Sequence, residues 1–374
     1  MDVWNRSFID EANTVFQLPR PVVEAFYAEL ERIAEDPGLQ SLALELSNQL
    51  HGSGGNKREA IARLREMGPE AGMFAAVVYA SGLPAIKEHY ISRGIPQYIL
   101  KDTMSDLGIW MHHHKQLHGA WGLSELGWLV HHFSGSIYKL GRLQFMPKTY
   151  NVKAKAFRNR TNGRILALTD AGVTFRSDGQ VNGTNGIYEK EGAWVSHYRN
   201  DGHLIYGNRI SPEGCAVRES VVLDGREWEL VLQEGDPVLD VHIPAAGKMS
   251  HDLCRESYRQ AVSFAAEFIP GAPIKAIMCS SWLLSPQLGR ILPPSSNIVT
   301  FMKDYFLTPV LSDDVQTFDR VFGAKPDDLS QAPRDTTLRR TVLDYVMAGH
   351  AIHGGAGFFL PELVTDERYA DRTG

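Results

Sequence analysis

One stretch near the middle of the chain combines a backbone suited to anions with side chains that add charge and hydroxyl groups. A predicted strand, Val238 to Ile243, leads through Pro244-Ala245-Ala246-Gly247-Lys248-Met249-Ser250 into a predicted helix over 251–268. Amide groups at a helix N-terminus attract negative charge, and glycine lets a backbone approach a ligand closely. The segment Ala246, Gly247, Lys248, Met249 and Ser250 is therefore a candidate phosphate-binding junction. An ordinary loop, with Ser250 capping the helix, is the alternative.

His242, at the end of the predicted strand, is the candidate general base, because an imidazole titrates near neutral pH. The alternation of side chains along a strand puts Asp240 on the same face as His242. The two residues are roughly 6.6 Å apart along a strand, so we do not expect Asp240 to orient the imidazole directly. A hydrogen-bonded structural histidine is the alternative.

A second group of titratable side chains lies in the N-terminal half of the chain. Its histidines are His112, His113, His114, His118, His131 and His132. His114 and His118 share a helix face at a spacing that can hold one metal ion. Consecutive histidines point in different directions and no HExxH motif occurs, so at most two or three could converge. We expect no metal, and a metal-binding helical enzyme using this cluster, His112 to His132, is kept as an alternative.

Composition narrows the class of protein. The chain has 374 residues, of which 43% are hydrophobic and 22% charged, as expected for two globular domains. A formal net charge of -6 argues against a nucleic-acid partner, which usually needs a basic face. No secretory signal and no apolar run long enough for a membrane span occur, and the three cysteines form no CxxC pair. These features predict a cytoplasmic protein with reduced thiols.

Hydrophobic periodicity divides the chain near residue 150. Before it, apolar residues such as Val22, Phe26, Leu30 and Ile33 recur at helical spacing. After it, short strand-like runs alternate with turns. Asp224-Gly225 predicts a hairpin between strands over 221–223 and 227–232, which the strand over 238–243 extends into an antiparallel meander. Beyond the helix over 251–268 we predict a strand over 274–279, helices over 296–306 and 336–349, and a final strand over 357–360.

Several strings in the chain resemble those of a bacterial acyltransferase family in which a helical N-acyltransferase N-terminal domain precedes a GNAT-like C-terminal domain. They span roughly residues 107 to 360. The strings are Trp128-Leu129, Leu140-Gly141-Arg142-Leu143-Gln144-Phe145, Val241-His242-Ile243-Pro244, Cys279-Ser280-Ser281-Trp282-Leu283-Leu284, Ser296-Asn297-Ile298 and Val321-Phe322-Gly323. The order of elements, antiparallel strands, turn, helix, strand, helix and strand, is similar to that of a GNAT domain.

The resemblance implies an α+β fold, with a helical N-acyltransferase N-terminal domain over 1–150. A GNAT-like domain over 151–374 follows it, built on a mixed, mainly antiparallel sheet flanked by helices. The implied reaction moves an acyl group from acyl-CoA, or from an acyl carrier protein, to an amine of a small molecule, with coenzyme A as part of the substrate.

The resemblance also implies roles for individual residues. The junction from Ala246 to Ser250 would hold the pyrophosphate, while Ser281 and Asn297 would lie near the pantetheine arm. Tyr305 would protonate the leaving thiolate, and a core aromatic role beside Phe301 is the alternative for it.

One departure from the family pattern keeps other functions open. GNAT enzymes commonly carry Q/R-x-x-G-x-G/A at this junction, where the present chain has Gly247 alone. A thioester decarboxylase or S-acyltransferase on the same fold is one alternative. A non-catalytic ligand-binding protein is the other.

Overall fold

The structure is a computed structural model that describes residues 3–245, 247–271 and 273–364. The chain divides into two compact units. The first comprises Met1–Met146 and Ile243–Lys248, and the second comprises Pro147–His242 and Met249–Gly374. The chain thus returns briefly to the first unit after the strand that ends at His242.

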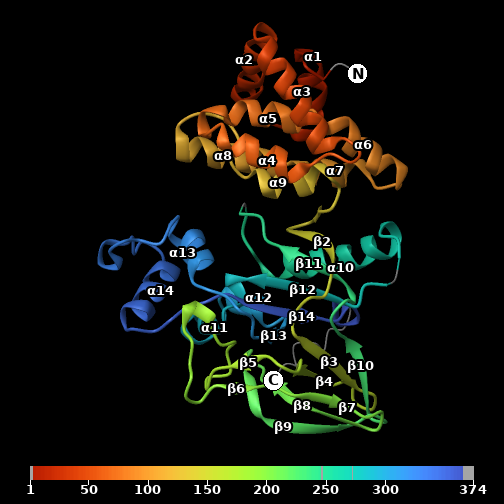
Figure 1. Ribbon diagram of the computed structural model, residues 1–374, viewed down its shortest axis with the longest axis vertical. Helices are drawn as coiled ribbons and strands as arrows, with labels where there is room; N and C mark the ends of the chain where they lie inside the picture. The colour runs from red at the N-terminus through yellow and green to blue at the C-terminus, as the bar shows by residue number, and fades with distance from the viewer. Residues whose placement is uncertain (1–2, 246, 272, 365–374) are drawn as a thin grey trace. The chain divides into compact units, whose positions relative to one another are not determined.

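The first unit is helical, as the sequence predicts (Figure 1). Its α-helices are α1 Arg6–Phe16, α2 Arg20–Glu35, α3 Pro37–His51, α4 Lys57–Glu66, α5 Gly72–Ala80, α6 Leu83–Ser92, α7 Gln97–Met104, α8 Asp106–His118 and α9 Leu126–Phe133. The predicted stripe on α2 is buried, including Val22, Phe26 and Leu30. Asp36 caps α3 by accepting hydrogen bonds from the amides of Gly38 and Leu39.

Helix α5 lies in the interior of this unit, since every residue from Phe74 to Ala80 is buried. A helix that is apolar on all sides is expected to be covered on all sides. Its first residue, Gly72, is tightly constrained. A Cβ atom there would lie 2.6 Å from the His114 ring and 3.0 Å from the Cα atom of Gly122. Any side chain at residue 72 would therefore push α5 away from α8.

A buried carboxylate joins α8 to α9. Asp106, only 3% exposed, accepts hydrogen bonds from the indole N–H groups of Trp110 at 3.0 Å and Trp128 at 2.8 Å. His132 Nε2 lies 3.0 Å from the same carboxylate. Burial alone would raise the pKa of Asp106, but these partners outweigh it and hold the pKa below its ordinary value. The charge is thus stabilised inside the helical unit.

The helices of the first unit are followed by a tight hairpin. Strands β1, Tyr138–Leu140, and β2, Leu143–Thr149, pair antiparallel with Tyr138 opposite Phe145 and Leu140 opposite Leu143. The turn holds Gly141 at φ 67°, a backbone conformation that favours glycine. Arg142 therefore stands at the tip of this hairpin.

The second unit contains a mixed sheet with the strand order β11-β12-β14-β13 (Figure 1). The bounds of these strands are β11 Pro237–His242, β12 Ala276–Ser281, β13 Phe306–Thr308 and β14 Gly355–Phe359. Strands β11 and β12 run parallel, and the β12–β14 and β13–β14 pairs are antiparallel. Helix α10, His251–Phe268, connects the two parallel strands and buries Cys254, Tyr258, Ala261, Phe264 and Ala265.

Shorter helices follow β12 in the second unit. They are α11 Pro286–Ile291, α12 Asn297–Met302, α13 Val315–Phe322 and α14 Thr337–Met347. The 3-10 turns of the chain are η1 Pro69–Ala71, η2 Thr184–Gly186, η3 Trp282–Leu284, η4 Leu329–Gln331 and η5 Pro361–Val364. The helix predicted over 296–306 is shorter than expected, because the chain after Met302 turns to pair β13 with β14.

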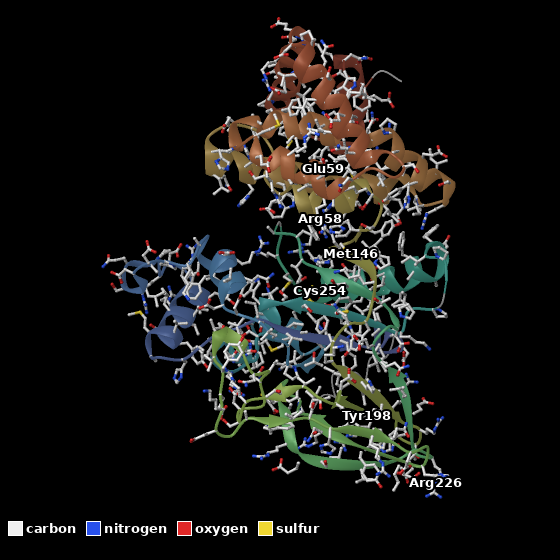
Figure 2. All side chains as sticks on the ribbon, in the orientation of Figure 1. Arg58, Glu59, Met146, Tyr198, Arg226 and Cys254 are labelled. Atoms are coloured by element: carbon white, nitrogen blue, oxygen red, sulfur yellow. The ribbon has the colours of Figure 1, made fainter. Side chains whose placement is uncertain are left out.

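A second sheet, with the order β10-β3-β4-β8-β7 and β9 paired to β8, belongs to the same unit. Its strands are β3 Ala154–Asn159, β4 Ile165–Thr169, β7 Tyr198–Asn200, β8 Leu204–Ile210, β9 Ala216–Asp224 and β10 Trp228–Leu232, while β5 Thr174–Phe175 and β6 Trp194–Val195 form a small separate pair. Phe157, Leu168, Ile205 and Leu223 form its core. Tyr198, labelled in Figure 2, stacks on Phe157 with ring centroids 6.5 Å apart.

The turn between β8 and β9 meets the first sheet of the unit. Gly214, at φ 74°, lies so close to β13 that a Cβ atom there would be 2.9 Å from the Cβ atom of Leu307. Only glycine fits this approach without a shift of the turn.

The predicted meander over 221–243 is wrong in its pairing. The chain does reverse at Asp224, whose carbonyl accepts a hydrogen bond from the amide of Glu227. The strands on either side of this turn then pair with other strands: β9 with β8, β10 with β3, and β11 with β12. Turn residues specify a reversal locally, whereas the choice of partner strand depends on side chains that are distant in sequence.

The predicted α+β fold class is confirmed: a helical N-terminal region precedes a mainly antiparallel sheet flanked by helices. The boundary predicted at residue 150 stays a prediction. Within the described residues, none of the helices has the length and apolar character needed to cross a bilayer.

We expect Asp106→Ala to lower the free energy of unfolding by about 3–5 kcal/mol, because it leaves buried donors of two tryptophans and a histidine without their acceptor. Urea unfolding followed by tryptophan fluorescence measures this change. The matched control is Asp102→Ala on the exposed surface of α7, expected to change stability by about 0.5 kcal/mol or less. Equal effects of the two substitutions would contradict a structural role for the buried carboxylate.

Candidate functional site

The end of β11 carries a buried carboxylate with two cationic or titratable partners. Asp240 is 7% exposed, and its Oδ2 atom accepts a hydrogen bond from Lys148 Nζ at 2.5 Å. His242 Nε2 lies 3.4 Å from the same oxygen, and the histidine side chain is 27% exposed. Burial alone would raise the pKa of Asp240, but His242 and Lys148 outweigh it and hold the pKa below its ordinary value. The carboxylate is therefore ionised near neutral pH.

The side chains of Asp240 and His242 approach more closely than their backbone spacing suggests, and the expectation about the orientation of the imidazole stays a prediction. The spacing of two residues along a strand predicted that Asp240 would be too far away to orient the imidazole. Both side chains lie on one face of β11, and the histidine ring reaches back far enough to meet the carboxylate. Backbone spacing alone underestimates the reach of two side chains that lean toward each other.

Strands β11 and β12 stop pairing at this point. Their parallel register joins Val238 with Ala276 and Asp240 with Met278, and within the described residues no pair between them follows. Beyond that point β12 continues to Ser281, paired on its other side with β14. The two strands thus part next to His242.

The predicted junction after β11 is held by an arginine. Arg142 donates hydrogen bonds to the carbonyl oxygens of Pro244 at 2.9 Å and of Gly247 and Lys248 at 3.2 Å. Gly247 has φ 86°, so glycine suits this position, and Ala246 lies outside the described residues. The Lys248 side chain is exposed. A cation from the β1–β2 turn thus fixes the backbone of the loop, a contact that the sequence did not predict.

Met249 and Ser250, which belong to the second unit, are half-buried. Ser250 occupies the N-cap position of α10 with extended backbone angles, and its side chain makes no capping hydrogen bond. The alternative in which the Ser250 hydroxyl caps α10 is therefore not what the structure contains. Ser281 instead caps η3, with its hydroxyl accepting from the amide of Leu283, and Asn297 is the exposed first residue of α12.

The first turn of α10 holds a histidine–aspartate pair that sequence reasoning missed. His251 Nε2 lies 2.9 Å from Asp304 Oδ1, and Arg255 Nη1 lies 3.9 Å from the same oxygen. The hydrogen bond with Asp304 raises the pKa of His251 above its ordinary value. Fifty-three residues separate the two partners, and no local pattern predicts such a contact.

Tyr305 lies between α12 and β13 in the interior of the second unit. It is 4% exposed, and its hydroxyl oxygen is 3.1 Å from that of Tyr258 on α10. Its ring packs on Phe301, with centroids 5.1 Å apart, and on Phe359. Burial raises the pKa of the Tyr305 phenol well above its ordinary value, so the group keeps its proton. Phe301 and Phe359 also make it part of the aromatic core.

The histidines of the N-terminal half have separate partners. His114 Nδ1 lies 2.7 Å from Ser124 Oγ, His131 Nδ1 lies 3.2 Å from Ser136 Oγ, and His132 contacts Asp106. The rings of His114 and His118 lie at a tilt to each other, with centroids 4.6 Å apart. In the part of the chain that the structure describes, no three His, Cys, Asp or Glu side chains are arranged to hold a metal ion.

Comparison with known families agrees with this architecture. The family model of the GNAT-like C-terminal domain matches residues 137–359, and that of the N-acyltransferase N-terminal domain matches residues 7–135. The chain therefore belongs to the GNAT-like C-terminal domain family, as the sequence strings predicted. No curated protein matches the chain significantly.

Three solved acyltransferase structures share the fold. One, a mutant in complex with octanoyl-CoA, is 21% identical, with a TM-score of 0.62 over 94% of this chain and 87% of that chain. A second, in complex with decanoyl-CoA and teicoplanin, is 20% identical, with a TM-score of 0.61 over 95% and 88%. A third, in complex with decanoyl-CoA, is 20% identical, with a TM-score of 0.60 over the same shares. The fold and the family are those of acyltransferases.

We expect His251 to titrate above pH 6.5, and Asp304→Asn to lower its pKa. Because the pKa is raised in the folded state, the pair stabilises the fold fully below pH 6.5 and loses this contribution as the pH rises through the folded-state pKa. NMR titration of the histidine ring protons measures the shift, with exposed His203 as the reference. A His251 pKa unchanged by Asp304→Asn would contradict the pairing.

Proposed function

We propose that this chain transfers an acyl group from an acyl-CoA thioester, or from an acyl carrier protein, to an amine of a small molecule. The observation that carries this proposal is the parting of parallel strands β11 and β12 beside a histidine–carboxylate pair. A thioester arm can insert beside strands that no longer share backbone hydrogen bonds with each other, because its own amide groups can then pair with the strand backbone. Membership of the GNAT-like family supports the same reading.

The donor's phosphate groups would bind at the junction over Ala246 to Ser250. Lys248 supplies an exposed cation, and Gly247 leaves its backbone approachable. The N-terminus of α10 lacks a side-chain cap, so its amides are available to an anion. Ser281 and Asn297 are proposed to contact the pantetheine arm.

In the proposed reaction the nitrogen of the acceptor amine attacks the thioester carbonyl carbon. A carbon–nitrogen bond forms, the carbon–sulfur bond breaks, and the nitrogen gives up a proton. His242 is proposed to accept that proton, and ionised Asp240 would stabilise the imidazolium that results. Tyr305 is proposed to return a proton to the thiolate, which its neutral phenol still carries. Atoms and charge balance once His242 releases its proton to solvent and Tyr305 takes one back, with free coenzyme A thiol and an amide as products.

The ligands of the solved acyltransferases suggest which donors to try first. Those acyltransferases were crystallised with octanoyl-CoA and decanoyl-CoA, and two of the complexes include teicoplanin or 10C-teicoplanin. We therefore propose a medium-chain acyl-CoA as the donor. The acceptor is proposed to be a small molecule with a free amine.

Assays of donor binding and of turnover also distinguish acyl transfer from two other functions that this fold could have. The single glycine of the junction, Gly247, favours a non-catalytic ligand-binding protein as the second candidate. Such a protein would bind coenzyme A without turnover over a broad panel of amines. Release of carbon dioxide from malonyl-CoA would instead identify a decarboxylase.

We expect octanoyl-CoA at about 100 times its dissociation constant to stabilise the fold by roughly 2.7 kcal/mol, visible as a thermal shift. Lys248→Glu should abolish the shift, because it puts a negative charge where the pyrophosphate would bind. Lys57→Glu, the same charge reversal at an exposed residue of α4, is the control and should keep it. If coenzyme A, acetyl-CoA, octanoyl-CoA and decanoyl-CoA all gave no shift, free coenzyme A thioesters would be excluded as donors.

We expect His242→Gln to lower kcat by about 100- to 10,000-fold, the usual contribution of a general base. Release of the free coenzyme A thiol from octanoyl-CoA in the presence of an amine panel measures the rate. The control is His203→Gln, at an exposed turn between β7 and β8. Donor binding should be unchanged in both variants. A His242→Gln variant with normal kcat would remove this residue as the base and leave the fold assignment untouched.

A further inference from the structure

A partly open cavity of about 420 Å³ lies in the second unit and borders β13, which is at the other end of the strand order β11-β12-β14-β13 from the strand that carries His242. Its walls come from β4 and β8 of the second sheet on one side and from α11, α12 and β13 on the other. Ligand pockets for small organic molecules usually measure about 300–1,000 Å³, so the cavity is large enough for one such molecule.

Apolar side chains form much of the cavity wall. Ile210, Val299 and Met302 are each less than 9% exposed, and they line the space together with Phe306 and Leu307 of β13. A wall of this kind favours a ligand with an apolar body, because contact with it removes hydrocarbon surface from water.

Four cationic residues from four different parts of the fold line the same cavity, and all four are exposed. Arg164 precedes β4, Arg209 belongs to β8, Arg290 belongs to α11, and Lys303 follows α12. In the part of the chain that the structure describes, the side chains of these four residues form no ion pair or hydrogen bond, while the backbone amide of Arg164 donates to Asn162 Oδ1. Other arginines of this unit, such as Arg160 and Arg176, are paired with carboxylates. In a chain whose net charge is -6, this gathering of unpaired cations is a marked local excess.

Glu213 is the single carboxylate in the cavity wall as described. A hydrogen bond from Ser211 is the main reason that its pKa is lowered, with smaller contributions from Arg290 and Arg209. Its charge offsets one cation and leaves the cavity positive.

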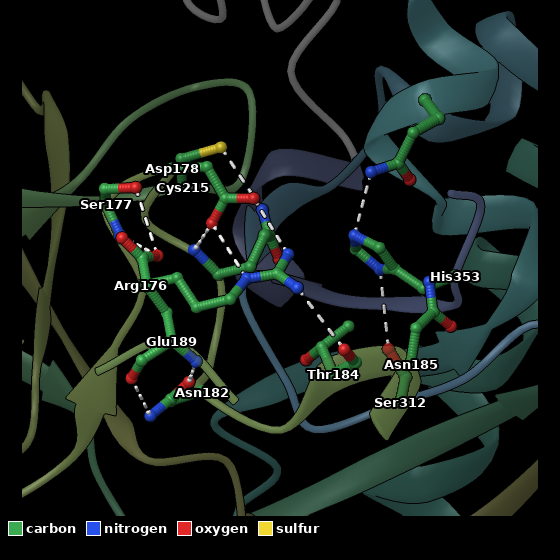
Figure 3. A network of polar contacts seen from close by, with 12 residues as sticks. Arg176, Ser177, Asp178, Asn182, Thr184, Asn185, Glu189, Cys215, Ser312 and His353 are labelled. Atoms are coloured by element: carbon green, nitrogen blue, oxygen red, sulfur yellow. Dashed lines mark hydrogen bonds and ion pairs between the residues drawn. The ribbon is translucent and has the colours of Figure 1, made fainter. Parts of the chain in front are cut away.

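A neighbouring cavity of about 500 Å³ lacks this excess. Figure 3 shows its arginine, Arg176, bonded to the carboxylate of Asp178 and to the carbonyl oxygen of Thr184. His353, in the same wall, bonds to Gln287 and contacts Ser312 (Figure 3). These polar side chains of the cavity wall therefore already have hydrogen-bond or ion-pair partners within the protein. Arg290 is shared by both cavities and has no carboxylate partner of this kind in the described structure.

We propose that the smaller cavity binds an amphipathic organic anion, with an apolar body against Ile210, Val299 and Met302 and an anionic head held by Arg209, Arg290 and Lys303. Guanidinium groups bind carboxylates and phosphates through paired charge-assisted hydrogen bonds, which fits either head group. The proposal concerns binding alone, and Tyr305, the proposed proton donor of acyl transfer, also lines this cavity.

The test measures binding of naphthalene carboxylate, naphthyl phosphate and uncharged naphthol to the full chain by isothermal titration calorimetry. We expect at least one anion to bind and naphthol to bind at least about tenfold more weakly. Arg209→Gln and Lys303→Gln should each weaken the anion by about tenfold. The control Arg218→Gln removes an exposed, unpaired arginine of β9 that does not line the cavity, and should leave binding unchanged.

The two anions distinguish the head groups, since the tighter of the two identifies a carboxylate or a phosphate ligand. Equal binding of naphthol, or an equal loss in Arg218→Gln, would overturn the proposal, as would the absence of binding by both anions at millimolar concentration. Displacement of the anion by coenzyme A, with weaker coenzyme A binding in Arg209→Gln, would make the cavity part of the donor site and overturn it as a separate one. Failure of octanoyl-CoA to bind would bear on the proposed function alone.

Discussion

The parallel pairing of β11 and β12 is the constraint on which much of the second unit depends. Parallel neighbours cannot be joined by a tight turn, so the chain must travel back along the sheet before β12 can begin. Helix α10, with 18 residues, makes this return. The same requirement sets a helix N-terminus shortly after the strand end that carries His242. Strand, junction and helix dipole are therefore consequences of one topological choice.

Three buried aspartates in the molecule share one arrangement. Asp106, Asp240 and Asp304 each lie within 3.4 Å of a histidine nitrogen, and each is less than 9% exposed. A carboxylate removed from water is costly unless donors replace its hydration, and histidine supplies a donor with a charge that can adjust. The residues around each histidine–aspartate pair then determine whether the pair is structural or can contact a ligand. Asp106 is enclosed by indoles in a helical core, whereas His242 and His251 stay partly exposed and within reach of a ligand.

Local sequence patterns were sufficient to predict some helices and strands, but not how the strands pair. Helix α10 begins and ends where its apolar stripe and the following Pro270 predict, because both signals lie within the segment itself. The pairing of β9 and β10 could not be read in this way, since the turn at Asp224 is compatible with several partners.

The candidate site also contains features that a local pattern predicts and contacts that depend on distant residues. His242 and the junction were visible as residue types near a strand end, but their partners were not. Lys148 and Asp304 come from segments far along the chain from Asp240 and His251. Such contacts depend on how whole elements pack, and no spacing within one segment encodes them. Arg142 is intermediate, because a family string marks it and only the folded hairpin explains its bonds to the loop.

The glycine of the β8–β9 turn has a consequence for behaviour at high concentration. Strand β13 is the last strand of its sheet, with only three residues, and its outer side would otherwise offer backbone groups to another chain. The turn at Gly214 lies directly against Leu307 of that strand. A short edge strand with a turn across it is a poor template for intermolecular pairing. A larger residue at position 214 would move the turn away from β13 and expose the edge of that strand. The folded protein would then associate with itself through this edge.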